Sequence, residues 1–522
     1  MKQGKLGRIL CCVLWILQLA VELLAAVSVH RLNMLPDRYF LLLAGGLVLL
    51  LMITGLLLLT GNRRGAFEKK KKKGVFRRIV GAMLAIAVIA GCAVVNTVVS
   101  RVHNAVDGIT GAAETVHVSM SVYVLADDPA GSIGDAAGYR FASLANYEAV
   151  RTEQAVSMIR QELGGELALD SYETPAELVE ALYNGDAQAL ILNSAYVSLL
   201  EEIPELADFS EKTRILYTAV IEQTIYKPTE PTEPDSTDPS DAKAPTEEPF
   251  TISGSPFVMY VSGSDTRDYY LSTSRSDVNI LMVVNPETKM VLLLNTPRDY
   301  YVANPAGGGS LDKLTHCGIY GINCSVDALE MLYDTEIRYH SQINFTGLET
   351  LVDAIGGVDV YAEYSFYAGR STWIYEGWNH LNGRGALAFA RNRYNQVDGD
   401  NGRGRNQMKV IQGVINKVTS GTTIIENYAG ILNSIQGMFR TNVTMEEIGE
   451  LVKMQLSDMA SWTIRSYAVT GTGGSEITYS MPGLYCYVMY PDEAKVAYGQ
   501  ELIRRVLDGE VLTEEDMVCP NN

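Results

Sequence analysis

Cysteine, histidine and the common nucleotide-binding loops are scarce or missing in this 522-residue chain. Its seven cysteines are too few for a fold built on disulfides, and its six scattered histidines form no zinc-site spacing. No cysteine is paired with a histidine at a spacing that indicates a thiol nucleophile. Without a Walker loop or a dinucleotide-binding glycine motif, a soluble nucleotide is also disfavoured as a ligand.

Basic residues are scarce outside the first fifth of the chain. Residues 1–101 contain 15 Lys and Arg against 3 Asp and Glu, whereas the other 421 residues contain 27 against 58. Because nucleic acid is bound through a basic surface, this acidic remainder argues against nucleic acid as a partner. The lysine run at 69–73 fits a cytoplasmic anchor against anionic lipid better.

Three long apolar runs lie at 9–29, 39–60 and 79–99, and each has the length of about 20 residues that a helix needs to cross a bilayer. The first run lacks a small-residue cleavage site, which disfavours a signal peptide. Basic residues gather at 63–78, and such loops stay in the cytoplasm. We expect 1–101 to form a short cytoplasmic tail and three transmembrane helices of a multi-pass cell-membrane protein, with the N-terminus inside the cell and the remaining domains extracellular.

A proline-rich acidic segment divides the exterior into two parts. The stretch KPTEPTEPDSTDPSDAKAPTEEP has six prolines and no large apolar residue, so 227–250 is expected to be an extended linker. The part before it, 112–226, opens with the alternating strand pattern VHVSMSVYVL and continues with helical patterns, which predicts a small α/β module. This module has few arginines, so its simplest interpretation is a spacer or an interaction domain without chemistry.

The part after the linker, 251–515, has the pattern of an α/β/α domain. Its strands at 278–284 and 290–295 are continuous apolar runs, which indicates that helices cover both faces of their sheet. A helix at 403–419 is expected to bury the side that carries Val410, Ile411, Val414 and Ile415. Further helical patterns lie at 324–334, 345–355 and 493–509.

Asp and Arg recur where the strands of this domain end. The pairs are Asp265 and Arg267, Arg275 and Asp277, and Arg298 and Asp299. A fourth group, RNRYNQVDGDNGRGRNQ at 391–407, puts four arginines and two aspartates into seventeen positions without a lysine. The guanidinium fork suits phosphate oxygens, and paired carboxylates suit a hard cation. Since open α/β folds bind ligands at strand ends, the pattern predicts a site for a magnesium-supported pyrophosphate.

Seven segments between about 255 and 420 resemble, in order, the LytR-CpsA-Psr family of cell-wall glycopolymer transferases. They read GSDTR, RSDVNILMVVNP, NTPRDYYV, DKLTHCGIYG, INFTGLETLVDAIGGVDV, HLNGRGALAFARNRY and GDNGRGRNQ. The three spans, the module and the RGRNQ ending look most like the capsule-associated branch, in which 112–226 is an accessory domain. The resemblance implies an α/β fold class, with an α/β/α sandwich on a mixed central sheet as the catalytic domain.

The resemblance further implies a membrane-anchored phosphotransferase. It would take a glycopolymer of capsule or teichoic acid type from undecaprenyl pyrophosphate and join it to peptidoglycan, while apolar residues between sheet and helices receive the prenyl chain. Carried over by motif, Asp265 and Asp277 hold magnesium (Mg²⁺). The residues that contact or support the pyrophosphate are Arg267, Arg275, Arg298, Arg391, Arg393, Asp400, Arg403 and Gln407. The catalytic set is Arg275, Asp277, Arg298 and Asp299, with Asp277 or Asp299 as the base. One departure is Asn406, which stands where the teichoic-acid branch tends to have an arginine.

Several alternatives stay open at this point. Water in place of the wall hydroxyl would make the same residues a polyprenyl pyrophosphate hydrolase. A non-catalytic regulator or assembly factor would instead use 112–226 to bind other polysaccharide-assembly proteins. Cys317 and Cys324 are close enough in sequence for a disulfide outside the cell, although spacing alone establishes none. His316 and His380 lie near the motifs and are interpreted as packing or hydrogen-bonding residues.

Overall fold

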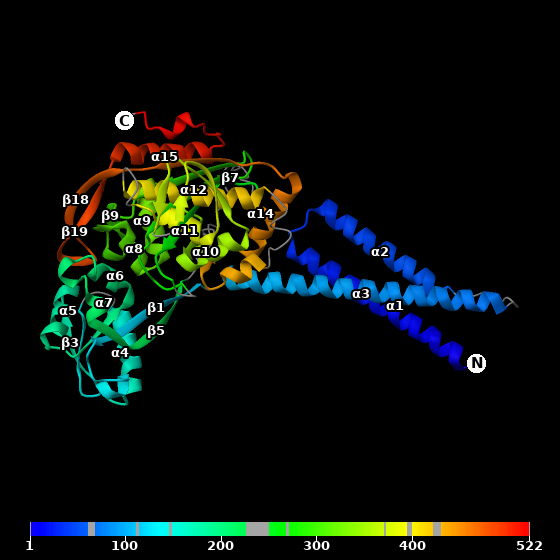
Figure 1. Ribbon diagram of the computed structural model, residues 1–522, viewed down its shortest axis with the longest axis horizontal. Coiled ribbons are helices and arrows are strands. Elements are labelled where there is room, and N and C mark those ends of the chain that lie inside the picture. Colours follow the sequence, from blue (N-terminus) through cyan, green and yellow to red (C-terminus); the bar gives the residue numbers. More distant parts are fainter. Residues whose placement is uncertain are drawn as a thin grey trace, which may run out of the picture.

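The computed structural model describes residues 2–60, 68–110, 114–145, 149–225, 250–267, 271–369, 372–393, 399–420 and 430–520. The linker expected at 227–250 lies outside the described residues, except for its last position. A bundle of three helices projects from a globular part (Figure 1). In the globular part, the module (residues 114–225) and the C-terminal domain (residues 250–520) lie side by side (Figure 1).

The helical bundle consists of α1 (Lys2–Leu32), α2 (Asp37–Leu59) and α3 (Glu68–Thr110). Each contains a stretch long and apolar enough to cross a membrane, and these stretches are Ile9–Leu32, Asp37–Leu59 and Val75–Thr110. Glu22, the acidic residue within the first stretch, is buried and accepts a hydrogen bond from Gln18, so its carboxyl group is covered by protein. The three helices agree in number with the three apolar runs of the sequence.

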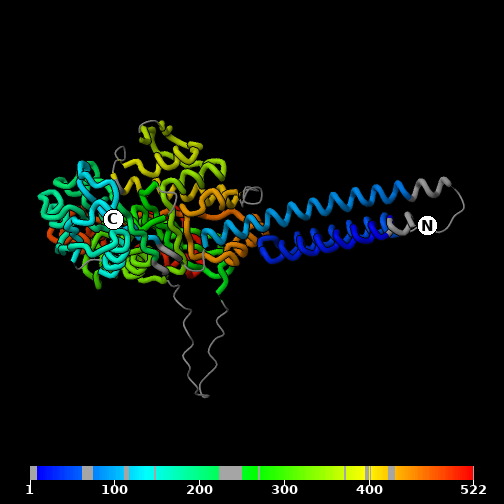
Figure 2. The backbone as a smooth tube through the Cα atoms, turned by 90° about the horizontal axis from the view of Figure 1, so that it is seen from below, coloured from blue at the N-terminus to red at the C-terminus, as the bar shows by residue number. Residues whose placement is uncertain are grey.

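The third helix is longer than its predicted span at 79–99. At 1.5 Å per residue, its apolar stretch of 36 residues is about 54 Å long, well beyond the ~30 Å of hydrocarbon in a bilayer. The excess enters the globular part, where Val102, Val106 and Ile109 are buried beside Leu432. Figure 2 shows α3 continuing from the bundle into the globular part. The C-terminal domain is thus attached to the end of this long apolar helix by side-chain packing.

The first residues of α2 also contact the C-terminal domain, at α14 (Met445–Asp458). Lys453 Nζ lies 2.9 Å from Asp37 Oδ1, and Arg38 Nη2 donates to the carbonyl of Ser457 at 2.7 Å. These groups are exposed, so the contacts add little stability. They constrain how the domain is turned relative to the bundle.

The module is a five-stranded sheet, ordered β3-β2-β4-β1-β5, with helices on both faces. Its strands are β1 (Glu114–Leu125), β2 (Arg140–Leu144), β3 (Ala168–Tyr172), β4 (Ala189–Asn193) and β5 (Thr213–Ile225). One face packs against α4 (Ala149–Leu163), and the other against α5 (Pro175–Asn184), α6 (Val197–Leu200) and α7 (Phe209–Lys212). A capping box between Thr174 and Glu177 begins α5, and Gly185 ends it with a positive φ.

The module shares a hydrophobic core with the C-terminal domain. Ile319, in α8 (Leu314–Tyr320), and Met481, at the start of β19 (Met481–Pro491), are fully buried in the module's cluster. The hydroxyl groups of Tyr196 and Tyr320 lie 3.2 Å apart across the same contact. Packing on this scale fixes the position of the module against the domain.

The C-terminal domain is built on a six-stranded sheet of order β16-β11-β6-β7-β8-β17. Its strands are β6 (Phe257–Ser264), β7 (Val278–Asn285), β8 (Met290–Asn295), β11 (Tyr339–Asn344), β16 (Phe439–Thr441) and β17 (Thr463–Ala468). The pairs β6–β11 and β8–β17 are parallel, whereas β7 is antiparallel to both of its neighbours. One face packs against α8, α9 (Ile322–Tyr333) and α15 (Glu493–Leu507), and the other against α12 (Asp400–Thr419) and α14. The predicted α/β/α sandwich with a mixed central sheet is confirmed.

Smaller elements that the sequence did not predict surround this sandwich. The paired strands are β9 (Tyr301–Asn304) with β10 (Ser310–Lys313), β18 (Gly471–Thr478) with β19, β12 (Val358–Ala362) with β15 (Gly377–Leu381), and β13 (Phe366–Ala368) with β14 (Thr372–Ile374). The last two pairs, with α10 (Phe345–Ala354) and α11 (Gly383–Arg391), form a subdomain over α12. Val410 and Val414 pack against this subdomain, whereas Ile411 and Ile415 pack against the sheet. The four residues expected on one buried side of α12 therefore serve two separate cores.

Candidate active site

The charged strand ends meet at one edge of the six-stranded sheet. Because β6, β8 and β11 run in the same direction, the residues that follow them lie at the same edge as the residues that precede the antiparallel β7. Asp265 and Arg267 follow β6, Arg298 follows β8, and Arg275 and Asp277 precede β7. The N–H of Asp277 donates to the carbonyl of Gly263 at 2.9 Å, which fixes Asp277 beside the end of β6.

These segments line a pocket of about 850 Å³. Seven arginines and four carboxylates line it, so its wall has an excess of positive charge although residues 102–522 are acidic overall. The predicted residues among them are Asp265, Arg267, Arg275, Asp277, Arg298, Arg391, Arg393, Arg403 and Gln407. The residues that the sequence did not predict are Glu202, Val278, Phe345, Glu349, Ala368, Gly369, Thr372, Arg384, Leu387, Ala388 and Asn392. An arginine-rich wall of this kind suits a ligand with several phosphate oxygens.

Asp277 lies at the centre of the ion pairs. Arg298 Nη1 donates to Asp277 Oδ1 at 3.0 Å, and Thr315 Oγ1 donates to the same oxygen at 3.2 Å. Burial raises the pKa of Asp277, but nearby positive charge, first that of Arg298 and then that of Arg275, outweighs this effect and holds the pKa below its usual value. Asp277 is therefore ionised at neutral pH.

Asp265 shows the opposite shift. Burial and the negative charge of Asp277 raise the pKa of Asp265, although Arg275 Nη2 lies 3.4 Å from its Oδ2. A divalent cation stabilises two carboxylates that repel each other in this way. Within the described ranges, no group of three or more His, Cys, Asp and Glu side chains could hold a metal ion. The two aspartates thus fit Mg²⁺ as part of a set completed by water and phosphate oxygens, the usual mode for this ion.

Asp299, which the sequence placed in the catalytic set, is not part of the pocket lining. Its Oδ2 lies 3.6 Å from Arg298 Nε, and its Oδ1 lies 3.2 Å from Lys313 Nζ. The carboxylate therefore lies behind Arg298, where it holds the guanidinium group in place. Of the two candidate bases, Asp277 is the one that lines the pocket.

Helix α11 presents a stripe of four residues to the pocket. Arg384, Leu387, Ala388 and Arg391 have the spacing i, i+3, i+4 and i+7, and all four line the wall. The ring of Phe345 lies 4.3 Å from the guanidinium carbon of Arg391, which orients this arginine by a cation–π contact. The motif HLNGRGALAFARNRY contains the stripe, so its helical spacing could have identified Arg384 as a further candidate.

The beginning of α12 contributes Arg403 and Gln407, which lie one turn apart. Asp400 is the first residue of this helix, and its side chain lies outside the described residues. Asn406, the departure noted in the sequence, is buried, and its Nδ2 donates to the carbonyl of Phe389 at 3.2 Å. Its observed role is therefore to hold α12 against α11.

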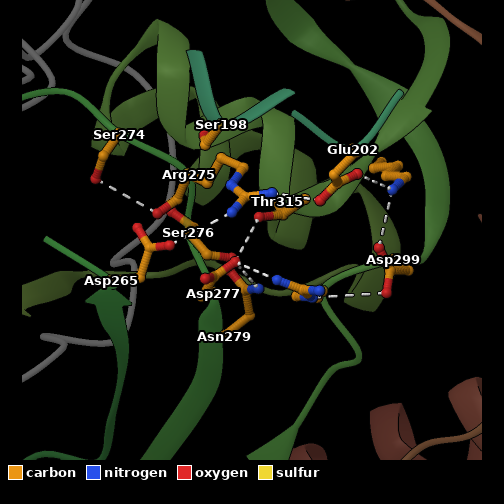
Figure 3. A network of polar contacts seen from close by, with 12 residues as sticks. Ser198, Glu202, Asp265, Ser274, Arg275, Ser276, Asp277, Asn279, Asp299 and Thr315 are labelled. Carbon is orange, nitrogen blue, oxygen red and sulfur yellow. Dashed lines mark hydrogen bonds and ion pairs between the residues drawn. The ribbon is translucent and has the colours of Figure 1, made fainter. Parts of the chain in front are cut away.

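Glu202 enters the pocket from the module. Its Oε1 accepts a hydrogen bond from Arg275 Nη1, and its Oε2 accepts one from Lys313 Nζ at 3.0 Å. Figure 3 shows Glu202 on the module's backbone in the same polar network as Asp265 and Asp299. Its partners lie 73 and 111 positions further along the chain, so no local pattern identifies it from the sequence.

The model of one protein family, described as the LytR_cpsA_psr family, matches residues 224–498, which is more than half of the chain. The chain belongs to the LytR-CpsA-Psr family. This confirms the family resemblance, whereas the capsule-associated branch stays a prediction.

Curated relatives of this LytR-CpsA-Psr protein are named polyisoprenyl-teichoic acid–peptidoglycan teichoic acid transferase TagU. The one from Enterococcus faecalis is 33% identical over 198 residues, which is 38% of this chain and 64% of that protein, so the match spans less than two thirds of it. The one from Bacillus subtilis is 31% identical over 234 residues, which is 44% of this chain and 72% of that protein. Crystal structures of TagV and TagU from Bacillus subtilis are 24% and 26% identical, with TM-scores of 0.41 and 0.38. The match to TagV covers 49% of this chain and 98% of that structure. The match to TagU covers 50% of this chain and 100% of that structure.

The two histidines near the LytR-CpsA-Psr motifs are not part of the pocket lining. His316 Nδ1 lies 2.6 Å from Asp312 Oδ1 in a fully buried pair. His380 Nδ1 lies 2.7 Å from Asp359 Oδ1, and both side chains are exposed. Their contacts agree with the interpretation of both as packing or hydrogen-bonding residues.

The cysteines of this LytR-CpsA-Psr chain are free. Cys317 and Cys324, for which the sequence left a disulfide open, are buried in α8 and α9. The Sγ atom of Cys324 lies 3.2 Å from Asn304 Oδ1. Both thiols therefore contribute to the core as reduced side chains.

Proposed function

We propose that this protein transfers a glycopolymer from an undecaprenyl pyrophosphate carrier to peptidoglycan and joins the two by a phosphodiester. The observation that carries the proposal is the pocket, in which seven arginines surround the paired carboxylates of Asp265 and Asp277. The curated relatives are named as transferases of teichoic acid between a polyisoprenyl carrier and peptidoglycan. The polymer is of the teichoic acid or the capsule type.

The reaction exchanges the phosphoanhydride bond of the pyrophosphate for a phosphate ester. A sugar hydroxyl of peptidoglycan attacks the phosphorus atom next to the glycopolymer, the bond from this phosphorus to the bridging oxygen breaks, and undecaprenyl phosphate leaves. The hydroxyl proton passes to a carboxylate, for which Asp277 is the candidate in the pocket wall. Because a loose phosphoryl-transfer transition state needs little covalent work from the protein, positioning and charge neutralisation supply most of the rate.

The arginines of the wall are held close together by neutral and acidic neighbours. Arg267 and Arg391 share the ring of Phe345, at 5.8 and 4.3 Å, so one aromatic side chain brings two like charges to the pocket. Arg298 is held between Asp277 and Asp299. Like charges this close attract an anion between them, and the pyrophosphate of the carrier matches that requirement.

The carboxylates of Asp265 and Asp277 would hold Mg²⁺, because burial and the negative charge of Asp277 raise the pKa of Asp265, and a bound cation offsets both effects. When bound, the ion would neutralise charge on the phosphate oxygens and make the phosphorus more open to attack.

The prenyl chain would begin along the apolar part of the wall. Val278, Leu387 and Ala388 form this part, beside the arginines. Deeper between the sheet and α12, Ile280 and Met408 are fully buried in a packed cluster. A prenyl chain that enters there, as the sequence suggested, requires these side chains to separate.

The N-terminus would face the cytoplasm and the globular part the outside. The bundle places the beginning of α1 far from the globular part, while the end of α3 packs into it (Figure 1). The basic positions at 69–78 lie in the first turns of α3, and basic segments stay inside. With three crossings, the pocket would then lie on the side of the membrane where peptidoglycan is found.

The test uses the full chain in nanodiscs, with a polyprenyl-pyrophosphate-linked glycan and peptidoglycan fragments. We expect transfer that depends on Mg²⁺ and that falls by about 100-fold or more in Arg298→Ala and in Asp277→Ala. Arg504→Ala, which removes a surface arginine of α15, is the matched control and should retain activity. Cleavage of the pyrophosphate without transfer would identify a hydrolase. A folded protein that neither binds nor cleaves the lipid would favour the regulator.

A further inference from the structure

Glu202 forms ion pairs with two cationic side chains at the pocket, and it can therefore affect how they are oriented. Its two carboxylate oxygens bind Arg275 and Lys313. The side chains of Arg275 and Lys313 are 9% and 3% exposed, whereas that of Glu202 is 35% exposed and lines the pocket. A buried cation points at its nearest carboxylate, because an unpaired charge is costly away from water. Glu202 therefore influences where both cations point.

The first contact leads to the proposed metal site. Arg275 Nη1 binds Glu202, while Arg275 Nη2 lies 3.4 Å from Asp265 Oδ2. The guanidinium fork is planar, so fixing one terminal nitrogen also fixes the other. Glu202 thus orients the group that holds Asp265.

The second contact leads to the arginine that binds Asp277. Lys313 Nζ lies between Glu202 Oε2 at 3.0 Å and Asp299 Oδ1 at 3.2 Å. Asp299 in turn lies 3.6 Å from Arg298 Nε, and Arg298 Nη1 reaches Asp277 at 3.0 Å. Both carboxylates of the proposed metal site are therefore connected to Glu202 by short chains of ion pairs (Figure 3).

The backbone on both sides of Glu202 is fixed by packing in the hydrophobic core of the module. On either side of it, Leu200 and Ile203 are buried in the module's cluster. The same cluster contains Ile319 and Met481 of the C-terminal domain, so module and domain share one core. A spacer needs no such core and no carboxylate in the pocket.

We propose that Glu202 is a positioning residue of the active site and that the module serves to place it there. It keeps Arg275 directed at Asp265, and Lys313 at Asp299, before the lipid arrives. This inference rests on the proposed function. Without the carboxylate, Arg275 and Lys313 keep one carboxylate partner each, Asp265 and Asp299, and lose the second contact that fixes their direction. The lipid then binds at least as tightly, but in a geometry that reacts slowly.

The experiment compares Glu202→Gln with Glu205→Gln, in the full chain in nanodiscs. Glu205 lies on the same segment, is exposed, and does not line the pocket, so its variant controls for a charge change on the module. We expect Glu202→Gln to lower kcat by about tenfold without raising KM for the polyprenyl-pyrophosphate-linked glycan, since misplacement rather than binding is affected. Glu202→Asp, which keeps the charge on a shorter arm, should restore part of kcat but not all of it.

Each outcome decides the question. A kcat for Glu202→Gln equal to that of Glu205→Gln would overturn the inference and return the module to a spacer. A rise in kcat/KM would overturn it too and would identify Glu202 as an inhibitory contact. Should Glu202→Gln fail to fold, as judged by its thermal unfolding, Glu202→Asp carries the comparison, and full activity there with unchanged kcat and KM contradicts precise positioning. A wild-type protein without activity refutes the proposed function, and with it this inference. An active wild-type protein whose Glu202 variants keep the same kcat and KM refutes the inference alone.

Discussion

Replacing Arg298 by methionine removes its charge and keeps most of its volume, so Arg298→Met tests whether the ion pairs hold Asp277 ionised. Arg298 and Asp277 are only 14% and 12% exposed. Removing one partner of a buried pair costs about 3–5 kcal/mol when the other charge is left uncompensated. Here Asp277 keeps its contact with Thr315, and Asp299 keeps Lys313. We therefore expect a smaller loss, about 2–3 kcal/mol, which lowers Tm by roughly 5–10 °C for a domain of this size.

The effect of Arg298→Met should depend on pH with a defined sign. The pKa of Asp277 is lowered in the folded protein, so its ionised form contributes stability above the unfolded value of 3.8, and this stability is lost as the pH falls through the folded value. Arg298 is the largest source of the lowering, so the variant has a higher pKa at Asp277 and loses less stability on acidification. The difference in Tm between the two proteins should be largest near neutral pH and shrink in acid.

The assay follows thermal unfolding of the full chain in detergent, in EDTA, from neutral pH into acid. Arg504→Met removes an exposed arginine that pairs with Glu501 on the same helix, and it should change Tm little at any pH. A Tm difference for Arg298→Met that stays constant over this range would refute the reasoning, because Asp277 would then not titrate with its partner. No difference at all would show that the pair contributes nothing to stability.

Three further outcomes follow from the contacts described. Mg²⁺ at 100 times its Kd should raise the free energy of unfolding of the wild type by about 2.7 kcal/mol and therefore raise its Tm. The Tm of Asp265→Asn should not rise, and an equal shift in this variant would exclude Asp265 as a ligand. Phe345→Leu should raise KM for the lipid about threefold to tenfold at constant kcat, because Arg391 loses the ring that orients it; steady-state kinetics would show otherwise if kcat falls instead. Asp312→Asn should lower stability by about 2–4 kcal/mol in thermal unfolding, since His316 loses a buried carboxylate, and changed kinetic constants would contradict its purely structural role.

The site residues that the sequence predicted best are those that lie directly at the ends of strands. Strands β7 and β8 are long apolar runs with clear limits, so the charged residues beside them are identified by position alone. These residues meet because neighbouring strands of the sheet alternate in direction around β7. Local patterns thus give the members of the pocket that lie directly at the ends of strands.

The residues that the sequence did not predict depend on contacts between distant elements. The helical spacing of the motif puts Arg384 on the same side of α11 as Arg391, but that this side faces the pocket depends on the packing of α11 against the subdomain core. Glu202 requires the docking of two domains. Val410 and Ile411 are adjacent in sequence but belong to different cores, since α12 lies between the sheet and the subdomain. None of these facts has a local cause, so no local pattern contains them.

The N-terminal helices and the module both restrict motion at the pocket before a lipid binds. The proposed carrier is a membrane lipid, so its pyrophosphate arrives at the membrane surface and the pocket must be held where it can meet it. The end of α3 is buried in the C-terminal domain, and α14 contacts the beginning of α2, so the domain is not free to turn. The entropy cost of fixing the domain is met on folding, so it does not recur each time the lipid binds. Glu202 does the same for Arg275 and Lys313 at the scale of single side chains. Since a loose phosphoryl-transfer transition state leaves the protein mainly the task of positioning charge, both contacts would serve the proposed reaction.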